Sequence, residues 1–185
     1  MNFHKHNLKP WGTELVNKYP LVFLEADPHN VPWAHQVGVV EADFVNLRYG
    51  FECQEGWIKH IENIAKKATE LVTYLRDPNL HCLPCAEKDA YIHSAIVKEK
   101  MGGLRWQGQY NLPPLFQDLW RSFVSSEENQ SYGTCEVTGK HGSIRRTKNG
   151  ESAWNKTLCT EEAIKQGYDL EEWENDLQIK SHPLS

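Results

Sequence analysis

The sequence predicts an α+β fold, in which a small mixed or antiparallel sheet packs against two or three helices. Apolar residues recur with helical spacing from Trp57 to Leu75. Two alternating segments flank a pair of glycines near residue 102, which is typical of a β-hairpin. Helical and extended segments alternate without the regular β-α-β rhythm of a parallel α/β protein, so α+β is the expected class.

The strongest helix prediction covers residues 57–75, where charged residues lie opposite the apolar stripe. Glu55 stands just before it, at the positive end of the helix dipole. A second helix is expected from Leu115 to about Ser125, after two prolines. Shorter helices are expected at residues 11–19 and 170–177, and another is expected to start at Thr160, which is a candidate N-cap.

The remaining segments predict strands. The hairpin runs from about residue 91 to residue 110, with Gly102 and Gly103 at the two positive-φ positions of its turn. Further strands are expected at residues 21–24 and 44–51, and short strands joined by turns between residues 133 and 159. Trp57, Trp120 and Trp154 are expected in the core.

Composition and charge narrow the class of protein. The chain has 185 residues, which suggests one domain, and its formal net charge of −5 argues against indiscriminate nucleic-acid binding. No apolar run approaches the roughly 20 residues of a membrane span, and no apolar segment follows the N-terminus as in a secretory signal. The five cysteines, an odd number with irregular spacing, argue against a secreted disulfide framework. We therefore expect a protein of the cytoplasm.

Four motifs occur in a fixed order along the chain. They are Cys53-Gln54-Glu55-Gly56-Trp57, Lys98-Glu99-Lys100-Met101-Gly102-Gly103-Leu104-Arg105, Cys135-Glu136-Val137-Thr138-Gly139 and Trp154-Asn155-Lys156-Thr157-Leu158-Cys159. Together they resemble an uncharacterised family of small proteins encoded by bacteriophages and prophage-like regions. The resemblance covers roughly residues 45–168. It departs at Glu55, where the family usually has aspartate, and at Met101, where it usually has phenylalanine.

This resemblance implies an origin in a mobile element and a location in the cytoplasm of a bacterial host, but it brings no established activity. It also suggests how the chain is divided. Residues 1–45 form a loop-rich N-terminal extension, residues 46–168 a single α+β core, and residues 169–185 a short acidic helix and tail.

The predicted hairpin carries the main candidate site. Its turn is expected to gather Lys98, Lys100 and Arg105 around one anion, with Trp106 beside them to stack on a ring or cover a loop of a partner. The alternative is a purely structural role, in which the two lysines face solvent and Arg105 pairs with a nearby carboxylate. Glu55, Trp57 and Arg145 complete the candidate ligand-binding set, and Arg146 extends a second basic cluster.

The cysteines are a weaker signal for metal or redox chemistry than the hairpin is for anion binding. Cys82 and Cys85 have the two-residue gap of a zinc knuckle, and Cys135 and Cys159 could complete a Cys₄ site. A zinc ribbon would need further ligands at positions 138 and 162, which hold Thr138 and Glu162. A lost zinc site repaired by hydrogen bonds is one interpretation, and simple buried thiols are the preferred one. No metal or cofactor is therefore expected.

The leading hypothesis is a non-enzymatic accessory protein that counters host defence. It would bind a host protein or sequester a small anionic ligand such as a nucleotide signal through the basic hairpin. The alternative is a small enzyme acting on a phosphorylated or nucleotide substrate, with Glu55 as its acid-base group. A sequence-tolerant nucleic-acid binder is disfavoured by the net charge, and the sequence leaves the oligomeric state open.

Overall fold

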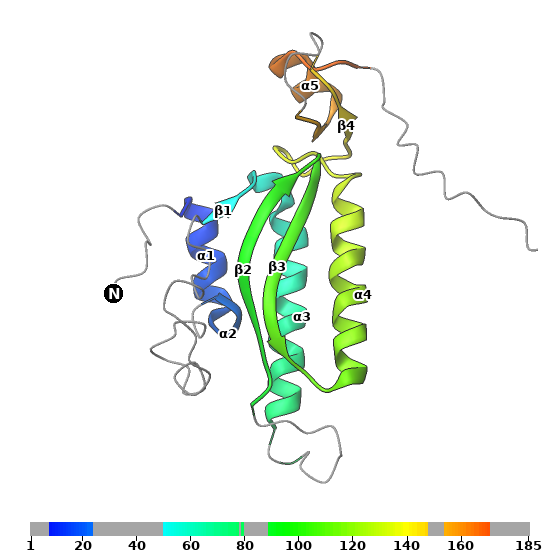
Figure 1. The fold of residues 1–185 in the computed structure, drawn as a ribbon. Helices are drawn as coiled ribbons and strands as arrows, with labels where there is room; N and C mark the ends of the chain where they lie inside the picture. The colour runs from blue at the N-terminus through cyan, green and yellow to red at the C-terminus, as the bar shows by residue number, and fades with distance from the viewer. Residues whose placement is uncertain (1–7, 24–49, 78, 80–88, 148–153, 171–185) are drawn as a thin grey trace, which may run out of the picture.

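The computed structural model describes residues 8–23, 50–77, 79, 89–147 and 154–170, and confirms the α+β class (Figure 1). The helical elements are α1 (Pro10–Lys18), α2 (Pro20–Phe23), the 3₁₀ helix η3 (Glu55–Trp57), α3 (Ile58–Arg76), α4 (Pro114–Ser131) and α5 (Thr160–Gln166). The strands are β1 (Phe51–Glu52), β2 (Tyr91–Lys100), β3 (Gly103–Asn111), β4 (Ser143–Arg145) and β5 (Lys156–Leu158). No helix in these ranges is long and apolar enough to cross a bilayer.

The main sheet has three strands in the order β1-β2-β3, and the predicted hairpin forms its larger part. β2 and β3 are antiparallel, with Lys98 opposite Arg105 and Lys100 opposite Gly103. β1 adds two residues in parallel on the other side of β2, which makes the sheet mixed. A register shift between Ser94 and Ile96 divides the hairpin into two halves.

The hairpin turn differs from the prediction by one residue. Met101 has φ 56° and Gly102 has φ 81°, so these two residues occupy the positive-φ positions, while Gly103 already belongs to β3. The backbone N–H of Gly102 donates to Glu99 Oε1 at 2.6 Å. The turn therefore places a residue with a side chain where the sequence suggested glycine, because a glycine pair fixes only the approximate centre of a turn.

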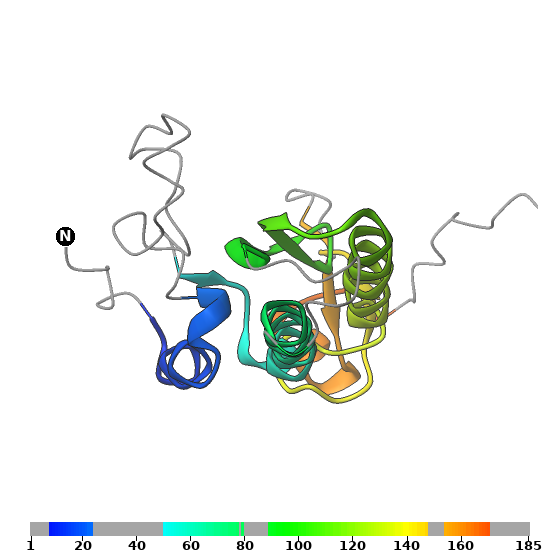
Figure 2. The same cartoon turned by 90° about the horizontal axis from the view of Figure 1, so that it is seen from below.

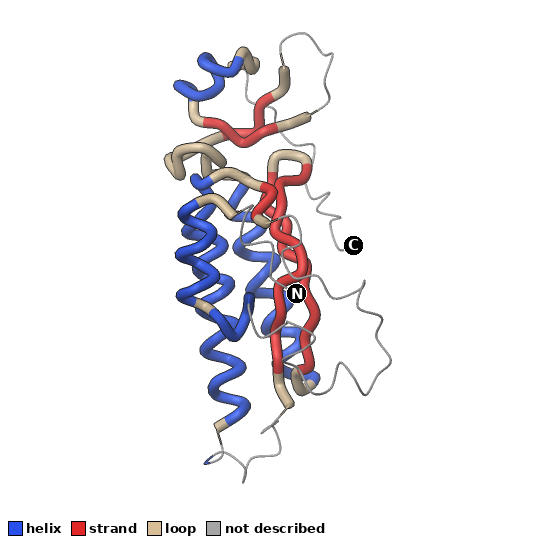
Figure 3. The backbone as a smooth tube through the Cα atoms, turned by 90° about the vertical axis from the view of Figure 1, so that its left-hand side faces the viewer, coloured by secondary structure: helices blue, strands red, loops and turns tan. Residues whose placement is uncertain are grey.

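The helices form a second layer behind the hairpin (Figures 2 and 3). α3 lies against the sheet with α4 beside it, and its apolar stripe is buried as the spacing predicted. Trp57, Ile61, Ile64 and Leu75 are all fully buried. A buried polar bridge also joins the two long helices, because His60 Nδ1 lies 2.8 Å from Glu127 Oε2. α3 thus anchors the core of the protein.

The N-terminal segment contributes to the same core. Val22 and Phe23 are buried against the sheet and α3, together with Leu15 and Val16 of α1. The strand expected at residues 21–24 is a short helix, α2, at residues 20–23. A four-residue apolar run carries no periodicity that separates a strand from a helical turn, and Pro20 at its first position suits a helix start.

A smaller unit stands at the tip of the hairpin (Figure 1). β4 and β5 pair antiparallel beside α5, and Cys135, Leu158 and Ala163 form a second small core. The helix α5 begins at the predicted place, but its N-cap is Cys159 and not Thr160. Trp154, expected in the core, is 66% exposed, because the residues around it form a polar segment before β5.

Several predictions lie outside the described residues. These are the strand over residues 44–49, the pair Cys82 and Cys85, and almost all of the C-terminal helix over residues 170–177.

Candidate functional site

The lysines of the hairpin tip share one face of β2 with Arg105 of β3. Lys98 lies directly opposite Arg105, and Lys100 follows two residues later. Neither lysine has a hydrogen bond or an ion pair with any residue that the structure describes. Glu52 lies in register beside Lys98 on β1, but no ion pair within 4.0 Å joins them. The tip therefore presents two unneutralised ammonium groups.

Arg105 is held by its own molecule. Its guanidinium donates to the hydroxyl of Tyr132 and, at 2.7 Å, to the backbone carbonyl of Leu104. The Tyr132 ring centroid lies 5.4 Å from the guanidinium carbon, within cation–π distance. These contacts fix Arg105 against the end of α4, so only part of its donor capacity remains for a ligand.

Trp106 does not lie at the hairpin surface. Its side chain is 7% exposed, and its ring centroid lies 5.7 Å from that of Phe23. Residues 104 and 106 of β3 point their backbone N–H groups away from β2, toward α4. Leu104 N–H donates to Ser131 Oγ at 2.8 Å, and Trp106 N–H donates to Glu128 Oε1 at 2.7 Å. α4 therefore covers the outer edge of the sheet and orients Trp106 inward.

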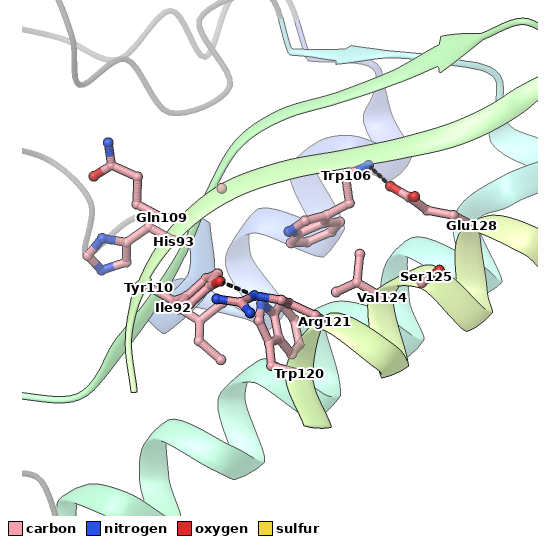
Figure 4. A pocket seen from close by; sticks show the side chains of 11 residues that line it. Ile92, His93, Trp106, Gln109, Tyr110, Trp120, Arg121, Val124, Ser125 and Glu128 are labelled. Carbon is pink, nitrogen blue, oxygen red and sulfur yellow. Dashed lines mark hydrogen bonds between the residues drawn. The ribbon is translucent and has the colours of Figure 1, made fainter. Parts of the chain in front are cut away.

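A pocket of about 200 Å³ opens between β3 and α4 at this point, and we call it the β3–α4 pocket (Figure 4). Its wall includes Ile92, Trp106, Tyr110, Trp120, Arg121 and Val124. Three of these side chains are aromatic, and the Trp106 ring extends from β3 toward α4 (Figure 4). The volume is below the range of about 300–1,000 Å³ that is typical of ligand pockets, so the pocket suits a single flat ring and not a whole drug-sized molecule.

Two polar groups give this pocket chemical character. Trp106 Nε1 is buried and has no hydrogen-bond partner among the residues that the structure describes, and it lies on the side of the ring away from Glu128 (Figure 4). Arg121, at the rim, donates from Nε to the Tyr110 hydroxyl at 2.7 Å. It also contacts Asp118 and Gln117 through its two terminal nitrogens. The guanidinium can still donate further bonds, because it carries five N–H groups.

The other residues predicted for the site lie apart from the hairpin tip. Trp57 is fully buried, and its Nε1 donates to the backbone carbonyl of Thr134 at 2.7 Å, so it belongs to the core. Glu55 is exposed at the start of η3. Arg145 is 4% exposed on β4 and donates to the backbone carbonyl of Leu170, which buries the cation instead of presenting it.

A second hollow, of about 250 Å³, lies where the four sequence motifs meet, and we call it the junction cleft. Each motif supplies part of its wall: Cys53 precedes η3, Glu99 lies on β2, Glu136 follows α4 and Lys156 begins β5. Gly56 makes the junction possible. Its N–H donates to the Glu136 carbonyl at 2.8 Å, and a Cβ there would lie 2.2 Å from the Cys135 carbonyl oxygen.

The electrostatics of the junction cleft centre on one buried ion pair. Glu136 Oε1 lies 2.9 Å from Lys156 Nζ, and Glu136 as a whole is 1% exposed. Burial raises the pKa of Glu136, which the hydrogen bond from Lys156 only partly offsets. Burial also raises the pKa of the Cys53 thiol to about 12, so this cysteine is not a thiolate near neutral pH.

The cysteines that the structure describes form no metal cluster. Thr138 Oγ1 donates to Cys159 Sγ at 3.8 Å, and Cys135 and Cys159 are free thiols. Burial raises the pKa of Cys135, but hydrogen bonds from the Thr138 hydroxyl and from nearby backbone N–H groups outweigh it, so the pKa lies below its usual value. Among the described residues, no group of three or more His, Cys, Asp or Glu side chains is arranged to hold a metal ion.

Sequence reasoning missed the residues that shape both hollows. Trp120 and Arg121 lie 14 and 15 residues after Trp106 in the sequence, and only the packing of α4 on β3 brings them together. Glu99, Glu136 and Lys156 belong to the four sequence motifs but were not among the predicted site residues. Their position inside these motifs was the available signal, but a motif does not show which side chains turn inward.

Comparison of the chain with protein-family models, with curated proteins and with solved structures finds no match. The assignment of function therefore depends on the geometry of the two hollows and the hairpin tip.

Proposed function

We propose that the protein is a non-enzymatic binding protein that holds a small ligand with a flat ring and a negative group, and a nucleotide is the class that fits. The observation that carries this proposal is the buried Trp106 indole N–H, which has no partner among the described residues and belongs to a side chain that lines the β3–α4 pocket. A buried donor without an acceptor costs about 1–3 kcal/mol, which a ligand acceptor would recover.

The rest of the pocket supports the same ligand class. Tyr110 is partly exposed and offers a ring surface for stacking beside the buried Trp106 and Trp120, and Arg121 at the rim offers a cation for a phosphate. Lys98 and Lys100 lie on the opposite face of the hairpin from Trp106, so they do not line this pocket, and Arg121 is the cation that serves it. Only a local basic surface is needed, so the net charge of −5 does not oppose it.

As the sequence predicts, the hairpin takes part in ligand binding through Trp106. The cation beside Trp106 is Arg121 of α4 in place of Arg105. Capture of a nucleotide signal inside a bacterial host is the role that such binding would serve for a phage accessory protein. The alternative enzyme has less support, because its proposed acid-base group Glu55 is exposed and, among the described residues, has no contact with a second catalytic group.

Isothermal titration with nucleoside monophosphates, the matching nucleosides and inorganic phosphate tests the proposal. We expect nucleotides to bind, nucleosides to bind more weakly and phosphate alone not to bind. Arg121→Gln should weaken nucleotide binding about tenfold, as loss of one charged hydrogen bond predicts. Lys165→Gln, an exposed charge on α5, is the matched control.

Three outcomes would overturn the proposal. The first is that no nucleotide binds, and the second is that Lys98→Ala or Lys100→Ala abolishes binding while Arg121→Gln leaves it intact. The third is turnover of the nucleotide by the wild-type protein that Glu55→Gln abolishes, which would establish the enzyme instead.

A further inference from the structure

The junction cleft contains a buried acceptor that its own molecule does not satisfy. Glu136 Oε1 pairs with Lys156, whereas Oε2 is buried and has no hydrogen-bond partner within the described part of the chain. Its side chain is 2% exposed, so solvent does not supply a partner at the protein surface. A carboxylate oxygen in this position gains free energy from any donor that reaches it.

The other residues that line the junction cleft favour a cation as the donor to Glu136 Oε2. Glu99 supplies a second carboxylate, whose Oε1 accepts the Gly102 N–H, while its other oxygen has no hydrogen bond or ion pair with a described residue. The Phe51 ring, 8% exposed, adds a surface over which a cation is attracted. The wall carries three carboxylates, from Glu52, Glu99 and Glu136, and the two ammonium groups of Lys9 and Lys156, so its net charge favours a cation over an anion. An apolar ligand would leave Glu136 Oε2 unsatisfied.

The cleft already accommodates an ammonium group from the protein. Lys9 Nζ donates to the Cys53 carbonyl at 3.3 Å and to Gln54 Oε1 at 3.1 Å. Lys9 is exposed and reaches the cleft on a flexible four-carbon side chain. Because this side chain is free to move outward, a ligand ammonium can take over the same acceptors and reach Glu136.

We propose that the junction cleft binds a small organic cation with N–H donors, in the form of a primary ammonium or guanidinium compound, between Glu136 and Glu99. The site is separate from the β3–α4 pocket and does not depend on nucleotide binding. Its volume of about 250 Å³ accommodates a compound of the size of agmatine or a short diamine.

Titration of the isotope-labelled wild-type protein with agmatine and with putrescine, followed by amide NMR, tests this proposal. Gly56 and Glu136, whose backbone groups are hydrogen-bonded across the cleft, should show the largest saturable shifts. Glu136→Gln should weaken binding about tenfold, because it removes the charge and keeps the shape. Glu161→Gln, an exposed carboxylate on α5 outside the cleft, is the control and should change nothing.

Should Glu136→Gln fail to fold, Glu99→Gln tests the second carboxylate, and the wild-type titration needs no variant. Absence of saturable shifts with either amine overturns the proposal, as does equal binding by Mg²⁺ alone, which lacks N–H donors. Titration with a nucleoside monophosphate separates the two sites: its shifts should fall at β3 and α4, so failure of one site leaves the other measurable.

Discussion

The backbone N–H of Trp106 donates a hydrogen bond to Glu128 Oε1 at 2.7 Å, and this contact attaches α4 to the outer edge of β3. An edge strand with unpaired N–H groups invites pairing with another chain. Here a side chain from a helix takes the place of a neighbouring strand. The same contact fixes the backbone from which the Trp106 ring enters the β3–α4 pocket (Figure 4).

Substitution at Glu128 therefore tests how α4 holds the sheet. Glu128→Ala should lower the free energy of unfolding by about 1.5–3 kcal/mol, because it removes a hydrogen bond to a charged acceptor. Glu128→Gln keeps an acceptor oxygen and should lose less. Urea denaturation measures both, and equal losses in the two variants would contradict a hydrogen-bonding role.

The hairpin turn contains a residue whose backbone conformation suits asparagine better than methionine. Met101 has φ 56° and is 66% exposed, so its side chain contributes little packing. Met101→Asn should raise the free energy of unfolding by about 0.5–1 kcal/mol, because Asn-Gly is the preferred pair at these positions. Gly102→Ala should lower it by about 1 kcal/mol, since Gly102 has φ 81°. Thermal unfolding checks both, and a loss of stability in Met101→Asn would refute the assigned turn.

The stability of the protein should fall in mild acid because of His93. Burial, together with the positive charge of Arg76, lowers the pKa of His93 from 6.5 to about 4. Tyr91 stacks on its ring at 4.6 Å. Between these two values the unfolded chain binds a proton that the folded protein does not, so stability decreases as the pH falls. The contribution of His93 amounts to about 2 kcal/mol between about pH 7 and about pH 5.

Urea denaturation of two histidine variants across this pH range isolates the contribution of His93 to the free energy of unfolding. His93→Gln should flatten the acid side of the stability profile, whereas His141→Gln, an exposed histidine, should leave the profile unchanged. An identical slope in the His93 variant and the wild type would show that another group is responsible.

The geometry around Cys135 and Cys159 predicts that a zinc site can be built there. Thr138 already hydrogen-bonds to both thiols, and Glu162 follows Cys159 within the first turn of α5. Thr138→Cys combined with Glu162→Cys adds two thiols to those of Cys135 and Cys159, which gives the four ligands of a structural zinc site. We expect stoichiometric zinc binding and a zinc-dependent rise in melting temperature, measured by metal analysis and thermal unfolding. The wild-type protein is the control, and a double variant that binds no zinc would contradict the arrangement.

The parts of the fold with strong local patterns were predictable from the sequence. The apolar stripe of α3 and the alternation of β2 and β3 depend on the period of each element, so they were recognised without knowledge of contacts. Residues 21–24 predict a strand only because four apolar residues carry no period, and packing against β2 and α3 decides the helical form of residues 20–23.

The candidate site was less predictable for a physical reason. Trp106 and Arg105 are neighbours in the sequence, but the alternation of a strand sends their side chains to opposite faces. Trp106 consequently meets Arg121, which lies on α4, whereas Arg105 meets Tyr132. The partner of a strand residue is chosen by the element packed on its face, and local sequence does not encode that choice.

The central claim is that the Trp106 indole N–H is kept unpaired for a ligand, and Trp106→Phe tests it most directly. This variant keeps a ring and removes the donor, and Trp154→Phe, an exposed tryptophan, is its matched control. Urea denaturation and nucleotide titration of the same two variants give the answer. We expect Trp106→Phe to change the free energy of unfolding by no more than about 1 kcal/mol while nucleotide affinity falls about tenfold. A variant that binds nucleotide as tightly as the wild type would contradict the account.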